Sequence, residues 1–169
     1  AGQWDADNGN YFIGREAGRN SLDLALSPIG KHNIGIGDST LFATDSGYWN
    51  IAIGRRALLA NTNGGGNVAI GANALFSNTT GLSNIAIGTT ALASNTTGGL
   101  NIAIGSSALR NNLGGNLNIA FGYFALDSNT TGSYNIANGY FAMARNTTGN
   151  YNIANGYQAL RHNTLGSYN

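Results

Sequence analysis

The sequence predicts a repeat solenoid in which 17-residue coils stack their short strands into one parallel β-sheet. Three observations predict this fold. An Asn recurs every 17 residues from Asn33 to Asn169, a Gly follows the first eight of these Asn residues four places later, and a second Gly follows ten places after that. A short fixed period is typical of stacked units that bury their apolar side chains only against neighbouring units.

Each unit opens with a predicted strand. Numbered from its Asn as position 1, the unit has the consensus N-I-A-I-G-x-x-A-L-x-x-N-T-T-G-x-x, and from Asn33 onward every Ile and Val lies at position 2 or 4. A spacing of two places these side chains on one face of a strand, with Asn and Ala on the other. Strands stacked at this period form a parallel sheet that rises about 4.8 Å per coil.

The second part of each unit predicts one helical turn. Segments such as 55–60 and 140–145 are rich in helix-forming residues and contain no Val or Ile. The Asn-Thr-Thr-Gly that closes most units ends in a Gly suited to positive φ. A short second strand is the alternative, because the segment has too few residues to distinguish the two.

The two faces of the strand carry different expectations. Ile51 and Ile53 are expected to pack inside the coil under Ala57 and Leu58, so that the Asn and Ala columns face outward. Stacked Asn side chains can bond along such a column. A flat face of small residues allows another chain to approach closely. A thin coil also buries only a small core by itself, so a homo-oligomer is expected. The candidate oligomer face is the column Ala52, Ala69, Ala86, Ala103, Ala120, Ala137 and Ala154.

The N-terminal part departs from the period. Gly14 and Gly37 are 23 residues apart, six more than one repeat, so residues 21–32 are expected to form an inserted loop. Residues 1–32 are therefore predicted to be a capping or joining piece with one irregular coil. Residues 33–169 are predicted to be eight solenoid repeats.

Composition limits the partners. Charged residues make up 9% of the chain and the net charge is +1, so no basic footprint for nucleic acid is expected. The chain has no Cys, and it has no apolar run near the roughly 20 residues of a membrane span, so membrane insertion is not expected. Regularly spaced aliphatic residues argue against disorder.

No enzyme, cofactor or metal site is predicted. His32 and His162 lie at non-equivalent positions without a nucleophile or carboxylate pair beside them, and Glu16 is the only Glu. The run from Asp5 to Glu16 has carboxylates spaced as in a calcium loop, but its Gly9 comes one place early. A plain polar turn is the favoured interpretation of that run.

The last three units gain aromatic residues after the first Gly and before the next Asn, where Tyr134, Tyr151 and Tyr168 lie. Aromatic ladders that stiffen the stack are the favoured interpretation. The alternative is an uncharged aromatic surface for a cell-surface glycan, since rings offer flat apolar faces with a polar tip. The candidate contact residues are Tyr123, Tyr140, Tyr157, Phe124 and Phe141.

The repeat N-I-A-I-G-x-x-A-L-x-x-N-T-T-G resembles the repeats of long fibrous proteins of tailed phages and marine bacteria. Its N-I-A-I-G core is also similar to the head repeat of trimeric autotransporter adhesins, which form a parallel β-roll trimer. The likeness covers Asn33 to Asn169 and departs from the adhesin head in its longer period and its Asn-Thr-Thr-Gly closure. The resemblance implies a homotrimeric, fibrous, adhesive protein at an extracellular or virion surface.

The expected function is that of a non-enzymatic structural or adhesive segment of an extracellular fibre, either a phage tail fibre or a bacterial surface adhesin. Such a segment spaces or presents a receptor-binding element. One alternative is an ice-binding solenoid, although the Thr pairs such as Thr79 and Thr80 lie at a turn and cannot both point from one strand face. The other alternative is a self-polymerising filament subunit whose N-terminal piece docks onto an open coil edge.

Overall fold

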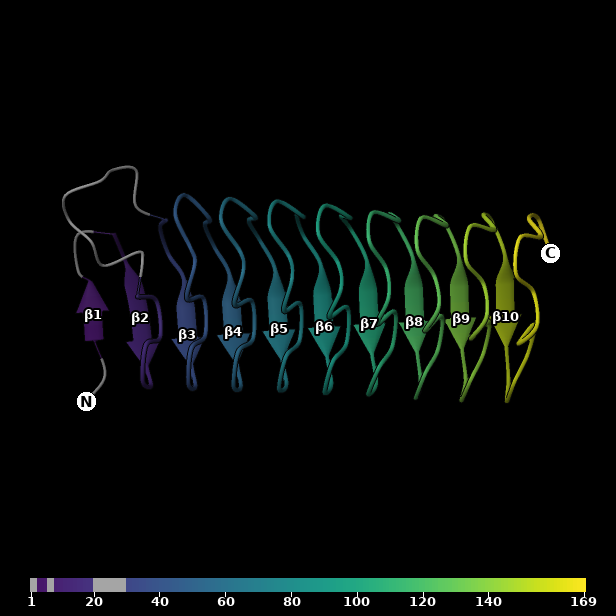
Figure 1. Ribbon diagram of the computed structural model, residues 1–169, viewed down its shortest axis with the longest axis horizontal. Helices are drawn as coiled ribbons and strands as arrows, with labels where there is room; N and C mark the ends of the chain where they lie inside the picture. Colours follow the sequence, from purple (N-terminus) through teal and green to yellow (C-terminus); the bar gives the residue numbers. More distant parts are fainter. Residues whose placement is uncertain (1–2, 6–7, 20–29) are drawn as a thin grey trace.

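A computed structural model describes residues 3–5, 8–19 and 30–169. These residues form a single sheet of ten strands that follow one another in the order of the sequence (Figure 1). The strands are β1 (Gln3–Asp5), β2 (Asn10–Ile13), β3 (Ile34–Ile36), β4 (Ile51–Ile53), β5 (Val68–Ile70), β6 (Ile85–Ile87), β7 (Ile102–Ile104), β8 (Ile119–Phe121), β9 (Ile136–Asn138) and β10 (Ile153–Asn155).

From β2 to β10 the sheet is parallel, and each strand pairs with the equivalent strand of the next coil. Ala52 in the middle of β4 lies beside Ala69 of β5, 17 residues later in the chain. The strands up to β10 keep this register. At the N-terminal edge, β1 pairs antiparallel with β2. The predicted solenoid of stacked 17-residue coils with one parallel sheet is confirmed.

The rest of each coil is a series of turns, and the described residues contain no helix. In the coil of β4, Arg56 and Leu58 have left-handed φ angles of 58° and 51°. The N–H of Leu58 donates to the carbonyl of Ala74 in the next coil at 3.0 Å, and the N–H of Ala60 donates to that of Phe76 at 3.1 Å. The expected helical turn is therefore wrong, because these N–H groups bond between coils. The left-handed residues also exclude a regular second strand.

In the coils of β4 to β9 the core holds one strand side chain and two turn side chains. In the coil of β6 these are Ala86, Ala91 and Leu92, and all three are fully buried. Leu92 has a φ of 52°, a conformation that costs an L-residue about 1–2 kcal/mol. Burial of its side chain and the hydrogen bonds between coils offset that cost.

The two Ile columns lie outside the coil, which corrects the expectation that they pack inside it. Ile51 and Ile53 flank the fully buried Ala52, and Ile53 is 37% exposed. With Leu58 filling the interior from the turn segment, the remaining space opposite it takes only a methyl group. The alternation has the predicted period of two, but the Ala face is inside the coil and the Ile face is outside.

Two columns of buried Asn run along the solenoid. At position 1, Asn84 Nδ2 donates to Asn67 Oδ1 of the preceding coil at 3.1 Å and to the carbonyl of Gly98 at 2.8 Å. At position 12, Asn95 Nδ2 donates to Asn78 Oδ1 at 2.8 Å and to the same Gly98 carbonyl at 2.9 Å. One Gly carbonyl per coil thus joins the two ladders. The predicted amide ladder is confirmed, but it lies inside the coil.

The two Gly columns mark the places where consecutive coils approach most closely. Gly54 has a φ of 122°, and a Cβ on it would lie 2.8 Å from the carbonyl carbon of Gly71. A Cβ on Gly81 would lie 2.5 Å from the carbonyl oxygen of Gly98. Backbone contacts this close leave no room for a side chain, which explains both Gly repeats.

The first described coil has a different core. Phe12 takes the strand position that Ala holds elsewhere, and it is buried. Gly18 stands at position 9 in place of Leu, Gly35 stands at position 3 of the next coil, and a Cβ on either would collide with the Phe12 ring. One large side chain therefore replaces several small ones. Residues 20–29 lie outside the described residues, and with them most of the loop expected over 21–32.

Candidate functional site

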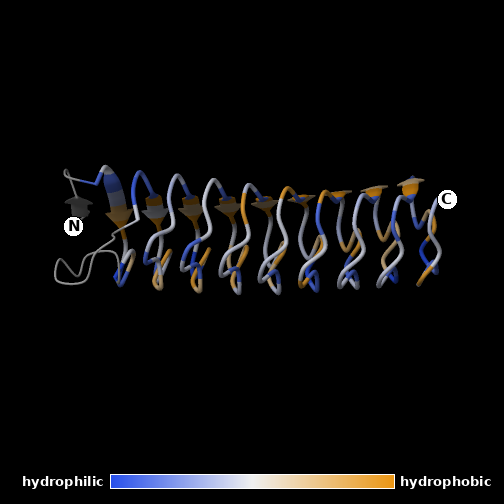
Figure 2. Cartoon of the chain, turned by 90° about the horizontal axis from the view of Figure 1, so that it is seen from above, coloured by the Kyte–Doolittle hydropathy of each residue, from blue (hydrophilic) through white to orange (hydrophobic). Residues whose placement is uncertain are grey.

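The outward face of the sheet is an uncharged and mostly apolar surface, which we name the sheet strip. It consists of positions 2 and 4 of strands β2 to β10, where every side chain is partly or well exposed. Figure 2 shows the strands together along one side of the coils. A contiguous exposed apolar face marks an interaction surface. Its members are Tyr11, Ile13, Ile34, Ile36, Ile51, Ile53, Val68, Ile70, Ile85, Ile87, Ile102, Ile104, Ile119, Phe121, Ile136, Asn138, Ile153 and Asn155.

The Ala column that was expected to face another chain is buried inside the coils. Its members are at most 2% exposed in the single chain, so their own coils already cover them. The oligomer face assigned to this column is therefore wrong, because the Ala methyl groups point at the Leu side chains of the core. The residues concerned are Ala52, Ala69, Ala86, Ala103, Ala120, Ala137 and Ala154.

The predicted aromatic residues form stacks along the turn side of the last coils. The rings of Tyr123, Tyr140 and Tyr157 are nearly parallel, with centroids 5.4 and 5.6 Å apart. In such a stack each ring turns its faces to its neighbours and leaves its edge and hydroxyl to solvent. A sugar packs on a ring face, and only the end rings have one free. The geometry favours the stiffening interpretation, and glycan contact at these residues stays a prediction.

The Phe residues beside this stack are half-buried and covered by cations. Phe124 and Phe141 stack at 5.1 Å, and the guanidinium groups of Arg110 and Arg161 lie 5.4 and 5.0 Å from their respective ring centroids. Arg110 Nε also lies 3.0 Å from Asp127 Oδ1. Burial raises the pKa of Asp127, and the attraction of Arg110 opposes that shift. This edge is packed, and of its two guanidinium groups Arg110 has a carboxylate partner.

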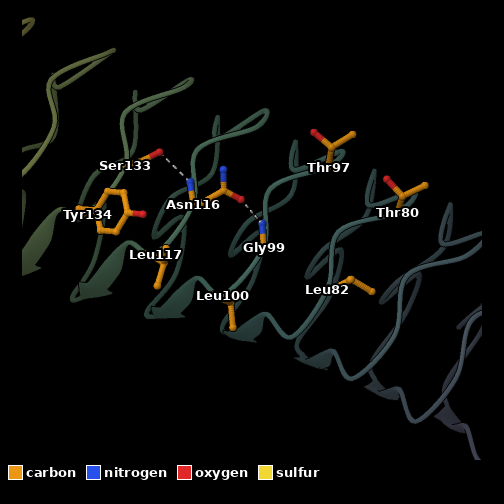
Figure 3. Close-up of a pocket in the computed structure, with 9 residues that line it drawn as sticks. All are labelled: Thr80, Leu82, Thr97, Gly99, Leu100, Asn116, Leu117, Ser133 and Tyr134. Atoms are coloured by element: carbon orange, nitrogen blue, oxygen red, sulfur yellow. Dashed lines mark hydrogen bonds between the residues drawn. The ribbon is translucent and has the colours of Figure 1, made fainter.

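A groove of about 440 Å³ crosses four coils at the corner that precedes the strands (Figure 3). Gly99 opens it, because the neighbouring positions in the same column, Leu82 and Asn116, carry side chains. The N–H of Gly99 donates to Asn116 Oδ1 at 2.8 Å, and the N–H of Asn116 donates to Ser133 Oγ at 3.0 Å. The groove therefore has a fixed polar floor and an apolar wall.

Tyr134 closes the C-terminal end of this groove (Figure 3). Its ring stacks on Tyr151 at 4.8 Å, and Tyr151 stacks on Tyr168 at 5.0 Å. Tyr134 is the first ring of that stack, and the equivalent residue of the preceding coil is Leu117, which also lines the groove. This groove was not among the predicted sites. Its trace in the sequence is the pair Gly99–Leu100, since the units on either side carry Leu82 and Asn116 in place of Gly99.

The charged groups form isolated contacts. Arg15 Nε lies 2.9 Å from Asp38 Oδ1, and this hydrogen bond lowers the pKa of Asp38. His162 Nδ1 lies 3.2 Å from a guanidinium nitrogen of Arg145 on the exposed surface. Across residues 3–5, 8–19 and 30–169, no three His, Cys, Asp or Glu side chains gather as metal ligands. Part of the run from Asp5 to Glu16, namely residues 6–7 and the Asp5 side chain, lies outside the described residues.

Within the described part of the chain, no segment forms a helix that could span a bilayer. Comparisons with known proteins find no family model, no curated protein and no solved structure that matches the chain.

Proposed function

We propose that the chain is a non-enzymatic structural segment of an extracellular fibre, which associates with copies of itself through the sheet strip. In this role it spaces or presents a receptor-binding element. The observation that carries the proposal is the unbroken Ile and Val surface of β3 to β7, which a single chain leaves open to water. The homotrimer and the placement on a phage tail fibre or a bacterial adhesin come from the resemblance of the repeat.

The area of the sheet strip is sufficient for a stable contact. Nine stacked strands span about 38 Å at about 4.8 Å per strand, and two side-chain columns with their flanks are about 15 Å wide. Each chain therefore contributes about 600 Å², and a pair buries about 1,200 Å², the lower end of stable interfaces. In a trimer around a shared axis, each chain divides this one strip between its two neighbours.

The partner that fits this surface best is another copy of the chain. The side chains of the sheet strip repeat once per coil. A second surface with the same repeat can therefore place its side chains between those of consecutive coils along the whole length of the strip. The strip carries no charge that would select a basic or acidic partner. Apolar burial alone then drives the contact.

The test is the native mass of the particle for the natural chain and for a variant carrying both Ile85→Ser and Ile87→Ser. Each copy then loses two half-exposed Ile side chains at every contact, and we expect the dissociation constant to rise by about 100-fold or more. The control variant carries Leu82→Ser and Leu100→Ser, two exposed Leu residues outside the sheet strip.

A monomeric natural chain, or an equal loss of assembly in the control variant, contradicts the proposal. Circular dichroism of both variants checks that the coils remain folded, since all four side chains are exposed to some degree in the single chain.

A second candidate function, binding of a neutral glycan, is favoured by the groove at Gly99. It combines the exposed side chain of Tyr134, the exposed residues Thr80 and Thr97, and no charge, which is a suitable lining for a sugar. Tyr134→Ser should abolish binding to an array of neutral oligosaccharides.

The matched variant is the triple change of Tyr123, Tyr140 and Tyr157 to Ser, which alters the other stack. If only this triple variant loses binding, the contact lies on that stack and the groove is not the site. If neither variant loses binding, both surfaces are excluded as the site.

The two alternative functions make different demands on the structure. An ice-binding face needs a regular array of free hydroxyls. Thr62, Thr79 and Thr96 each donate to the carbonyl of the next coil at 2.9–3.1 Å. The exposed column that contains Thr80 and Thr97 is interrupted at Gly114. A self-polymerising filament needs growth along the axis of the solenoid. Particle length measured by electron microscopy separates it from side-by-side association.

A further inference from the structure

Four of the buried Asn side chains belong to a motif for covalent modification. The sequence N-x-Ser/Thr, with x other than Pro, is the acceptor for N-glycosylation, and as a pattern it indicates a surface loop. The chain contains it where a unit closes with Asn-Thr-Thr, so that the acceptor Asn is at position 12 and the required Thr is at position 14. The acceptor residues are Asn78, Asn95, Asn129 and Asn146.

The acceptor nitrogens are already engaged in the solenoid. Asn95 Nδ2 donates to Asn78 Oδ1 at 2.8 Å and to the Gly98 carbonyl at 2.9 Å, which uses both of its hydrogens. The other three acceptors make the same two bonds, to the preceding Asn of the ladder and to the Gly three residues later. All four residues are fully buried, so an enzyme cannot reach their side chains in the folded chain.

The space around these nitrogens is too small for a sugar. A single carbon atom on Gly81 would lie 2.9 Å from Asn95 Nδ2, and one on Gly132 would lie 3.0 Å from Asn146 Nδ2. Non-bonded carbon atoms prefer separations of about 3.5–4.0 Å, so even a methyl group is crowded there. A glycosylated Asn can therefore enter its coil only if neighbouring coils separate, which breaks the ladder and the hydrogen bonds between coils.

We infer that closure of the solenoid and N-glycosylation of these four Asn residues exclude each other. In the transfer, Nδ2 forms a bond to C1 of the first sugar, the bond from C1 to the diphosphate of a lipid-linked sugar donor breaks, and one amide proton is released. The folded coil hides Nδ2 from this donor, whereas an unfolded chain exposes it. The solenoid must therefore form where N-x-Thr is not modified before folding. This inference does not depend on the proposed self-association.

The experiment compares folding with modification in the secretory pathway of a eukaryotic cell. The natural chain is expressed behind a cleavable signal peptide, and the product is separated into protease-resistant and protease-sensitive molecules. The same chain made in a bacterial cytosol is the reference for the folded, resistant state. Mass spectrometry then measures the glycan at each acceptor in both fractions. We expect every glycan to be in the sensitive fraction and the resistant fraction to carry none.

A variant with Ala at all four position-14 Thr residues lacks the acceptor sequences and keeps every buried Asn. These Thr residues are exposed, so the coils should fold unchanged. In the same cells we expect this variant to carry no glycan and to be wholly protease-resistant. The matched control has Ser at the same four residues, which retains the acceptor sequence, and it should behave as the natural chain does. The changes are Thr80→Ala, Thr97→Ala, Thr131→Ala and Thr148→Ala.

A third variant, Leu75→Asp with Leu92→Asp, places two charges in the core and should prevent closure of the coils. Its glycan content shows whether the unfolded chain is accepted by the enzyme, and we expect it to be glycosylated. A natural chain that is wholly resistant and free of glycan beside this glycosylated variant supports the inference, because folding has then hidden the acceptors. Glycan on resistant molecules, a core variant without glycan, or a protease-sensitive Ala variant overturns it.

Discussion

Replacing Asn84 tests whether the inner amide ladder stabilises the stack. Asn84 donates twice, to Asn67 Oδ1 and to the Gly98 carbonyl. Its own Oδ1 accepts the backbone N–H of Asn101 at 3.0 Å and the side-chain Nδ2 of Asn101 at 3.1 Å. Asn84→Ala removes all four bonds from a fully buried site.

The cost depends on which partners are left without a bond. The Gly98 carbonyl still accepts from Asn95, Asn67 Oδ1 still accepts the backbone N–H of residue 84, and Asn101 Nδ2 still reaches the Gly115 carbonyl. The backbone N–H of Asn101 is the group left unpaired, which costs about 1–3 kcal/mol, and the small cavity adds about 1 kcal/mol. We expect Asn84→Ala to lower the free energy of unfolding by about 3 kcal/mol.

The matched variant Asn84→Asp keeps the shape and removes the donors. At neutral pH its carboxylate oxygen would face Asn67 Oδ1 and the Gly98 carbonyl, so we expect a larger loss than for Ala. Burial should raise the pKa of this Asp above its unfolded value, so the penalty is present at neutral pH and disappears as the pH falls below about 4.

Urea unfolding followed by circular dichroism at pH 7 and pH 4 measures both variants. Coincidence of far-UV and tyrosine signals checks that a two-state analysis holds, which a repeat protein does not guarantee. A loss below about 0.5 kcal/mol for Asn84→Ala, or equal stability of Asn84→Asp and the natural chain at pH 7, refutes the assigned role of the ladder.

Four more predictions follow from the same coils. Ala86→Leu should overpack the interior and lower the free energy of unfolding by about 1–3 kcal/mol. A variant with an unchanged free energy of unfolding but weaker oligomer assembly would show that the Ala column lies on an exposed contact face instead. Because Leu92 has a left-handed φ, Leu92→Gly should be at least as stable as Leu92→Ala in urea, the reverse of the usual order. Deleting residues 84–100 should keep the circular dichroism spectrum and shorten the rod by about 4.8 Å in scattering, whereas an eight-residue deletion should misfold. Since burial raises the pKa of Asp127, ionisation there opposes folding, so the natural chain should gain melting temperature relative to Asp127→Asn as the pH falls from 7 to 4; a relative decrease contradicts the assignment.

The period of the sequence predicts the stacked coils, the parallel sheet and the amide ladder, because each of these needs only identical residues at identical places. It does not predict which strand face is inside. Alternation with a period of two distinguishes two faces, and the volume left by Leu58 decides which one is buried. A signal for the answer exists in the sequence: position 2 holds Tyr11 and position 4 holds Asn138 and Asn155, whereas position 3 accepts Gly or Ala and only once Phe12.

The residue pattern does not predict the left-handed turns or the groove, for a different reason. Leu58 and Leu92 are ordinary helix-forming residues by intrinsic preference, and hydrogen bonds to the next coil override that preference. The aromatic stacks could be predicted, because equivalent residues in consecutive coils must lie side by side. The groove depends instead on residues of four coils and on the missing side chain of Gly99 between Leu82 and Asn116.

The direction of the hydrogen bonds between coils has a mechanical consequence. Bonds such as the one from Ile85 N–H to the Asn101 carbonyl run along the axis of the solenoid, so tension between the ends of the chain loads them coil by coil. Each coil that peels away converts a rise of about 4.8 Å into roughly 58 Å of extended chain, because a residue spans about 3.4 Å when stretched. The molecule would therefore lengthen in steps of about 53 Å and dissipate work at each step, and the remaining coils would still carry the load.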